Sequence, residues 1–313
     1  MLDLQFSKKT IRGTFANQLL RLVSKFPDIK KHHPVNFGRL YTTELTDTFR
    51  FPKNIVANQI EFHTAKMEWI YKSNNIGKNI ILQFHGGAYV SGYSDIYRKS
   101  ALKYLSLTCS CSVLSLDYRL APIHPFPAAF EDAIAAYDFV ISKGYLSENI
   151  ILVGDSAGGG LVLALGLYLR DQQRVLPKAI ITMSAWTDLA AEGESYLRNI
   201  KLDPLLGENT DPLDVKGYIG HEDIHNPYIS PVYGQYHNYT NLMMHVGSNE
   251  VLESDTLSVA KIASDAGNNV KVTIYRGMFH VFQLAFGLIP EAKKAWKEIG
   301  KYIETQFTCN LER

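Results

Sequence analysis

The segment from Ile151 to Leu165, ILVGDSAGGGLVLAL, constrains the fold more than any other part of this 313-residue chain. It joins a short apolar run to a longer one through the sequence GDSAG, centred on Ser156. In a Gly-x-Ser-x-Gly pattern of this kind, the glycines permit a sharp strand-to-helix turn that exposes the serine hydroxyl at the end of a sheet. A glycine-rich turn with a capping serine is the alternative. The strand-like and helix-like runs on both sides favour a nucleophilic serine.

Short apolar runs and helical patterns alternate along most of the chain. The runs that predict buried strands are residues 79–84, 111–117, 149–154, 178–184, 241–248 and 270–277. This alternation predicts a mostly parallel sheet with helices on both faces. Residues 190–234 break the alternation and are rich in Asp, Asn, Pro, Gly and Tyr, so we expect an irregular insertion there.

Composition excludes several classes of protein. The net charge of +1 gives no basic field for nucleic acid. Only one residue separates Cys109 from Cys111 among three cysteines, so we expect reduced thiols and a cytoplasmic location rather than a disulfide framework. The first residues lack a signal-peptide pattern, and no apolar run reaches about 18 residues, the length of a membrane span.

The N-terminal region predicts an amphipathic helix. Its apolar residues recur at helical spacing, at Ile11, Phe15, Leu19, Leu22, Val23 and Phe26. Such a stripe either packs onto the protein's own body or lies on a membrane surface. Packing is the more common outcome, so we expect no membrane contact from this helix.

A second glycine-rich turn, HGGA, follows the strand predicted at 79–84. Small residues there would let backbone amides approach a reacting carbonyl, as an oxyanion hole requires. The candidate donors are the amides of Gly86, Gly87, Ala88 and Ala157. We expect His85 to brace this loop rather than to act as a base.

A base and an acid are expected after the last two predicted strands. His280 follows the strand at 270–277, although a buried histidine in an aromatic segment would read in the same way. The preceding strand is followed by Asn249 and Glu250. An acid that orients a histidine and stabilises its protonated form must carry charge, which favours Glu250 over Asn249. Asp255, farther along, is expected to cap the next helix.

These motifs together resemble the hormone-sensitive lipase family of α/β hydrolases, known for its HGGG loop. The similar segments are HGGAY (85–89), DYRLAPIHPFPAAFED (117–132), GDSAGG (154–159), SAWTDL (184–189) and GMFHVF (277–282). Three positions depart from the family pattern. Ala88 replaces the third glycine, Ile123 replaces a usual Glu, and Asn249-Glu250 stands where most members carry the catalytic Asp.

The resemblance implies an α/β-hydrolase fold with a mostly parallel eight-stranded sheet, helices on both faces and a helical cap. We therefore expect N-terminal cap helices in residues 1–45, a catalytic core in 46–189 and 235–313, and a cap insertion in 190–234. A substrate pocket lined by Tyr89, Tyr93, Trp186 and Phe282 is one use of these aromatics, and plain core packing is the other.

The expected activity is hydrolysis of carboxylic esters with short to medium acyl chains, through Ser156, His280 and Glu250 and an acyl-enzyme, without metal or cofactor. An amidase or deacetylase would use the same parts. A binding protein without catalysis is a further alternative, which the presence of His280 disfavours. The expected partner is a small ester substrate, and a homodimer is left open.

Overall fold

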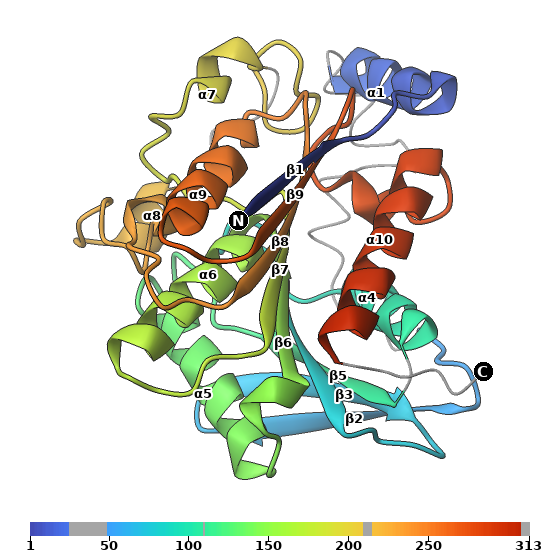
Figure 1. Ribbon diagram of the computed structural model, residues 1–313, viewed down its shortest axis with the longest axis vertical. Helices are drawn as coiled ribbons and strands as arrows, with labels where there is room; N and C mark the ends of the chain where they lie inside the picture. Colours follow the sequence, from blue (N-terminus) through green and yellow to red (C-terminus); the bar gives the residue numbers. More distant parts are fainter. Residues whose placement is uncertain (25–48, 109, 209–214, 308–313) are drawn as a thin grey trace.

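The centre of the molecule is one twisted sheet, which runs through the ribbon in Figure 1. The computed structural model describes residues 1–24, 49–108, 110–208 and 215–307. Within these residues the sheet has nine strands in the order β1-β9-β8-β7-β6-β4-β5-β3-β2. They are β1 (Leu2–Phe6), β2 (Ile55–Phe62), β3 (Ala65–Lys72), β4 (Asn79–Phe84), β5 (Cys111–Asp117), β6 (Ile150–Asp155), β7 (Ala179–Met183), β8 (Asn241–Gly247) and β9 (Val270–Tyr275).

The sheet is parallel except at β3, which pairs antiparallel with both β2 and β5. Strands β4 to β9 correspond to the six that the apolar runs predicted, and these predictions are confirmed. Strands β4 and β6 are buried along their whole length, because helices cover both faces of a parallel sheet. Their carboxyl ends therefore meet at one edge, where polar residues from several loops converge.

The strand count and one boundary differ from the predictions. The sheet has nine strands rather than eight within the described residues, because β1 pairs in parallel with β9, with Phe6 opposite Ile274. Residues 2–6 had been assigned to the N-terminal cap. Their sequence, LDLQF, alternates apolar and polar side chains, a period suited to a strand, and their backbone pairs with the otherwise open edge of β9. Residues 25–45 of the predicted cap lie outside the described residues.

Helices form a layer on each side of the sheet (Figure 1). One layer consists of α5 (Ala128–Ser142), α6 (Ser156–Asp171) and α9 (Glu253–Asp265), and the other of α4 (Asp95–Leu107) and α10 (Pro290–Gln306). The smaller elements are α1 (Ile11–Ser24), α7 (Ser195–Arg198), α8 (Val215–Ile219), and the 3-10 turns η1 (Ser147–Asn149), η2 (Pro231–Tyr233) and η3 (Phe282–Ala285). α7 and α8 lie in the insertion predicted at 190–234, of which residues 209–214 are outside the described ranges.

Helix α1 forms as predicted, but it packs with the opposite side to the one expected. Its buried residues are Gly13, Asn17 and Ser24, whereas the apolar stripe at Ile11, Phe15, Leu19 and Leu22 is exposed. The reason is the close fit against α10. A Cβ at Gly13 would lie 2.4 Å from the carboxylate of Glu291, so a larger residue there would displace this buried side chain.

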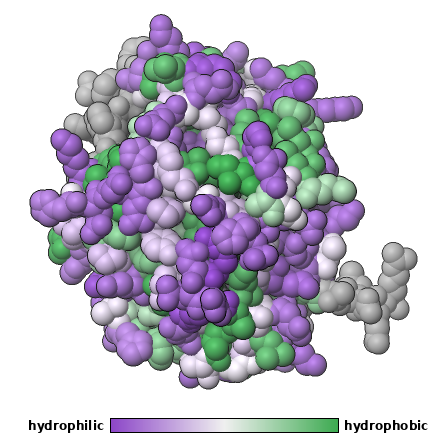
Figure 2. Space-filling view, turned by 60° about the vertical axis from the view of Figure 1, so that its left-hand side comes forward, coloured by the Kyte–Doolittle hydropathy of each residue, from purple (hydrophilic) through white to green (hydrophobic). Residues whose placement is uncertain are grey.

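The remaining surface is mostly hydrophilic, with separate hydrophobic patches, on the face that Figure 2 presents. No helix within the described residues is long and apolar enough to cross a membrane. Cys111 is buried at the start of β5, and Cys109 and Cys309 lie outside the described residues.

Candidate active site

Ser156 stands on a tight turn between β6 and α6. Its φ of 51° is in the left-handed region, which costs energy for a residue with a side chain. The flanking glycines permit the turn. A Cβ at Gly154 would lie 2.2 Å from the carbonyl oxygen of Gly158, and one at Gly158 would lie 2.3 Å from that of Phe84. The sequence GDSAG therefore produces the strand-turn-helix that the pattern predicted.

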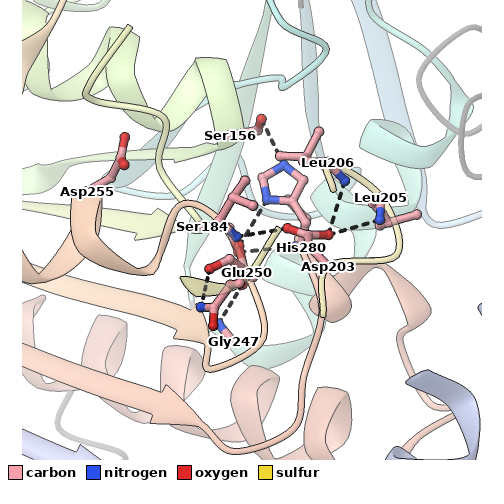
Figure 3. A network of polar contacts seen from close by, with 12 residues as sticks. Ser156, Ser184, Asp203, Leu205, Leu206, Gly247, Glu250, Asp255 and His280 are labelled. Atoms are coloured by element: carbon pink, nitrogen blue, oxygen red, sulfur yellow. Dashed lines mark hydrogen bonds and ion pairs between the residues drawn. The ribbon is translucent and has the colours of Figure 1, made fainter. Parts of the chain in front are cut away.

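Ser156, His280 and Glu250 form a continuous line of hydrogen bonds (Figure 3). The Nε2 atom of His280 lies 3.0 Å from the Ser156 hydroxyl oxygen, and its Nδ1 atom lies 3.0 Å from Oε2 of Glu250. The three residues come from the loops after β6, β8 and β9, up to 124 positions apart in sequence. With Nδ1 protonated, Nε2 is left to accept the serine proton.

Asn249, the alternative to Glu250, lies in a different environment. Its amide oxygen accepts a hydrogen bond from the Ser248 hydroxyl at 3.4 Å, and its backbone N–H donates to the carbonyl of Met278. It is the neighbouring Glu250 whose carboxylate meets the imidazole of His280. The geometry therefore favours Glu250 as the acid.

Ser184, at the end of β7, fixes Glu250 in place. Its hydroxyl donates to Oε1 of Glu250 at 2.8 Å and accepts a hydrogen bond from the backbone N–H of Val281 at 3.1 Å. Ser184 thus ties the acid to the loop that carries His280. Nothing in the sequence assigned a role to Ser184, because only the folded chain brings the end of β7 between these two loops.

The insertion after β7 supports the same loop from the other side. The backbone N–H of Val251 donates to Oδ2 of Asp203, while the amides of Leu205 and Leu206 donate to Oδ1 (Figure 3). The side chain of Asn199 donates to the carbonyl of Glu250 at 2.7 Å. Asp203 and Asn199 were not predicted. The only signal in the sequence was their place in an unusually polar insertion.

The electrostatics of His280 and Glu250 follow from burial and from neighbouring carboxylates. Burial alone would lower the pKa of His280, but its hydrogen bond to Glu250 and the charges of Glu250, Asp203 and Asp155 raise it above the ordinary value. Burial also raises the pKa of Glu250, an effect that His280 opposes. The pair therefore favours an imidazolium once a proton reaches Nε2.

The HGGA loop lies beside the serine, since a Cβ at Gly86 would lie 3.0 Å from the Cβ of Ser156. Gly87 adopts a φ of 116°, and a Cβ there would meet Ser91 at 2.8 Å, so glycine is required at this position. Ala88 also has a positive φ, 54°, although it replaces the third glycine of the family pattern. Ala157 lies in the first turn of α6, where amides lack intrahelical partners and the helix dipole is positive. These three amides remain the candidates for an oxyanion hole.

Gly86 was wrongly included among those amide donors. Its N–H donates to the hydroxyl of Tyr97 at 2.8 Å, so it is already engaged. The Tyr97 hydroxyl in turn donates to Oδ2 of Asp155 at 3.2 Å, and burial raises the pKa of Asp155 to about 7. Tyr97, on α4, therefore links the HGGA loop to the residue that precedes Ser156.

His85 is held within the scaffold. Its ring stacks on Tyr118 at a centroid distance of 4.0 Å, and the Tyr118 hydroxyl donates to the carbonyl of His85. Burial lowers the pKa of His85 to about 4, which keeps the ring neutral. These contacts favour a bracing role.

The four aromatic candidates for the pocket fall into separate environments. Tyr89 stacks on Tyr218 at 3.7 Å and lies near Trp186, with ring centroids 6.2 Å apart. Tyr93 instead donates to Glu68 at 2.9 Å, and the Phe282 ring packs near that of Tyr275. The structure thus brings Tyr89 and Trp186 together, joined by Tyr218 of the insertion.

Asp255 does not cap its helix as predicted. It lies inside α9, fully buried, and its Oδ2 accepts hydrogen bonds from the backbone amides of Thr187 and Asp188. Burial raises the pKa of this carboxyl to about 8. Asp255 therefore anchors the loop after β7. Within the described ranges, no group of three or more His, Cys, Asp or Glu side chains is arranged to hold a metal ion.

Comparisons with known proteins agree with the fold and the motifs described above. A family model described as the alpha/beta hydrolase fold matches residues 81–284. An acetyl-hydrolase of Streptomyces hygroscopicus is 34% identical over 238 residues, which cover 76% of this chain and 79% of the relative.

Two solved structures extend the likeness to nearly the whole chain. One is an esterase from the bacterial hormone-sensitive lipase family, 30% identical, with a TM-score of 0.82. The other is the esterase EstE5 soaked with p-nitrophenyl butyrate, 28% identical, also with a TM-score of 0.82. Each alignment covers 96% of this chain and 100% of the other.

Proposed function

From its membership of the hormone-sensitive lipase branch of the alpha/beta hydrolases, which are serine hydrolases of the esterase and lipase kind, we propose a specific reaction for this chain. It cleaves short to medium acyl esters through Ser156, His280 and Glu250. The observation that carries the proposal is the line of two 3.0 Å hydrogen bonds through His280. One similar protein is an acetyl-hydrolase, and crystals of another were soaked with p-nitrophenyl butyrate. Both facts favour short acyl groups as substrates of this chain.

The proposed reaction begins with attack of the Ser156 hydroxyl oxygen on the ester carbonyl carbon, as its proton passes to Nε2 of His280. The amides of Gly87, Ala88 and Ala157 stabilise the oxyanion that develops. Collapse of the tetrahedral intermediate expels the alcohol, which takes the proton from His280 and leaves an acyl-enzyme. Water then repeats the sequence, releases the acid and restores the serine.

Glu250 acts through His280 in this scheme. Its carboxylate accepts a hydrogen bond from the Nδ1–H group, holds the imidazole in the orientation that faces Ser156 and stabilises the positive charge after proton transfer. Its own position is over-determined, since Ser184 donates to one carboxylate oxygen while His280 meets the other. The carboxylate has little freedom to leave the imidazole.

We also propose that residues 190–234 act as a cap over the site. Asn199 and Asp203 of this segment bond to the loop of Glu250, and Tyr218 stacks on Tyr89 beside the HGGA loop. The aromatic group of Tyr89, Trp186 and Tyr218 is the candidate wall of the acyl or alcohol pocket. A modest apolar pocket of this kind favours short to medium chains.

The test is a series of p-nitrophenyl esters from acetate to palmitate, with matched anilides, on the wild type and Ser156→Ala. We expect hydrolysis that is fastest with short or medium esters, and a loss of at least about 10⁴-fold in Ser156→Ala. A fluorophosphonate probe should label the wild type alone. Labelling that persists in Ser156→Ala would contradict the proposed nucleophile, and faster anilide than ester hydrolysis would identify an amidase.

A further inference from the structure

Helix α1 carries its largest apolar side chains on the side that faces away from the protein. Ile11, Phe15, Leu19 and Leu22 are 89%, 66%, 42% and 57% exposed. Their spacing of four, four and three residues places them along one side of the helix. We refer to these four residues as the outer stripe. Ordinary packing would place such a stripe against the core.

The inner side of α1 is already satisfied by different residues. Gly13 and Asn17 are buried, and the Gly13 amide bonds to the Thr10 hydroxyl at the start of the helix. The Thr10 amide donates to the buried carboxylate of Glu291 on α10, and Leu20 packs against the cluster that includes Phe279. A rotation of α1 about its axis that buried the outer stripe would break these contacts. The contacts of the inner side therefore keep the outer stripe exposed.

Exposed apolar residues gather at this end of the chain. Among the described residues, sixteen large hydrophobic side chains are exposed, and eight of them lie between Met1 and Leu22. The others are scattered singly, as at Leu146, Val175 and Leu288. Single exposed hydrophobics are ordinary on a protein surface, whereas a concentrated group marks a binding surface.

The charges near the outer stripe distinguish between two possible partners, a second copy of the chain and a lipid surface. Residues 1–24 carry basic side chains at Lys8, Lys9, Arg12 and Arg21 and a single acidic one, Asp3. A two-fold contact between two copies would bring the same basic side chains together and is disfavoured. Arg12 and Arg21 belong to α1 itself, and Lys8 and Lys9 directly precede it. An apolar stripe with cations beside it is instead the pattern of a helix that lies in the interface of an anionic lipid layer.

The outer stripe also lies on the catalytic side of the molecule. Strand β1 runs parallel to β9 and ends at Phe6, so α1 begins at the same edge of the sheet from which the loop of His280 leaves. Figure 1 shows α1 beyond the ends of β1 and β9, beside α10. Ala16 and Leu20 pack against the hydrophobic cluster that includes Phe279 and Phe282, the aromatic residues on either side of His280.

We propose that α1 docks the protein onto an anionic lipid surface. The outer stripe enters the boundary between headgroups and acyl chains, and the basic side chains contact lipid phosphates. The catalytic edge is then held beside the lipid layer, where apolar esters are concentrated. The proposal that α1 binds lipid depends only on the structure of α1 and its charges. The proposal that this binding brings ester substrates to the active site rests also on the function proposed above.

The experiment measures flotation of the full chain with vesicles of phosphatidylcholine and phosphatidylglycerol (3:1) and with pure phosphatidylcholine vesicles. We expect binding to the anionic vesicles that weakens in high salt. A Phe15→Ser/Leu19→Ser double variant should lower the partition coefficient by about tenfold or more, because two large side chains no longer enter the interface. A matched control, Leu146→Ser/Leu288→Ser, should bind as the wild type does.

Three results would overturn the docking proposal. The first is a wild-type chain that stays unbound with anionic vesicles. The second is an equal loss of binding in the Leu146→Ser/Leu288→Ser control. The third is a wild-type dimer, without vesicle binding, that becomes a monomer in the stripe variant, which would make a second copy the occupant. Hydrolysis of p-nitrophenyl acetate in the absence of lipid should be unchanged in the stripe variant. The proposed catalysis is tested separately by Ser156→Ala, which should lose hydrolysis of p-nitrophenyl acetate while it still binds anionic vesicles.

Discussion

The loops that follow β7, β8 and β9 and helix α1 lie at the same edge of the sheet, yet they are built in opposite ways. In the loops, polar groups are buried and held by several partners, as Glu250 is by Ser184 and His280. In α1, small and polar residues such as Gly13 are buried, and large apolar ones such as Phe15 face outward. The first region is organised for precise internal geometry, and the second for contact with something outside the chain.

The largest expected effect comes from removing the charge of Glu250, the proposed acid of the triad. Glu250→Gln keeps the side-chain shape but favours the wrong imidazole tautomer and leaves the imidazolium without a counter-charge, so kcat should fall by about 10⁴-fold. Asn249→Ala, the adjacent control, should lower kcat by less than about tenfold, because losing one neutral hydrogen bond costs little. Steady-state kinetics on p-nitrophenyl butyrate measures both. A greater loss in Asn249→Ala would reverse the assignment.

A smaller loss is expected when the support of the acid is removed. Ser184→Ala deletes a hydrogen bond to Glu250 and one from the Val281 amide. Since hydrogen bonds to charged groups contribute about 1.5–3 kcal/mol, kcat should fall by about 10- to 100-fold with little change in KM. Ser106→Ala, on the exposed side of α4, serves as control. An unchanged kcat in Ser184→Ala would show that Glu250 needs no such brace.

The link through Tyr97 is expected to matter somewhat less, because it acts on the HGGA loop rather than on a reacting group. Tyr97→Phe removes the acceptor of the Gly86 amide and the donor to Asp155, so kcat should fall by about tenfold. The control is Tyr104→Phe, which also removes a buried tyrosine hydroxyl, about two turns farther along α4, where the ring packs on Trp296. Equal losses in the two variants, measured with unchanged melting temperatures, would argue against a specific role for Tyr97.

The smallest effect is expected on the outer side of α1. Phe15→Ser should change the free energy of unfolding by no more than about 0.5 kcal/mol, as is usual for an exposed position. Gly13→Ala, on the inner side, should destabilise the protein by about 1–3 kcal/mol, because the new Cβ meets the carboxylate of Glu291. Urea unfolding of both variants distinguishes the two sides. A larger loss in Phe15→Ser would mean that the outer stripe is packed.

The sequence predicted those features that depend on local pattern. Apolar runs located strands β4 to β9, and the GDSAG turn located Ser156. The order of serine, acid and histidine, together with the need for charge, singled out Glu250 and His280. Each strand and the GDSAG turn depended on a few neighbouring residues, whereas the choice of Glu250 and His280 also used the order of residues along the chain.

Features that depend on distant contacts were missed. Ser184, Asp203 and Tyr97 reach the site from three separate elements, and no spacing in the sequence records that meeting. Gly86 was misassigned for the same reason, since its partner lies on α4. The helical period of α1 revealed an apolar stripe, but the side that packs was decided by the fit of Gly13 against Glu291.

The pH dependence of kcat/KM tests most directly whether His280 is coupled to Glu250. Protonated His280 cannot accept the serine proton, so activity is lost as pH falls through the pKa of this group. Because Glu250 raises that pKa, the acid limb of the wild type should lie above the ordinary imidazole value of about 6.5. In Glu250→Gln, the limb of the residual activity should move to lower pH. An acid limb that stays in place in Glu250→Gln would contradict the triad.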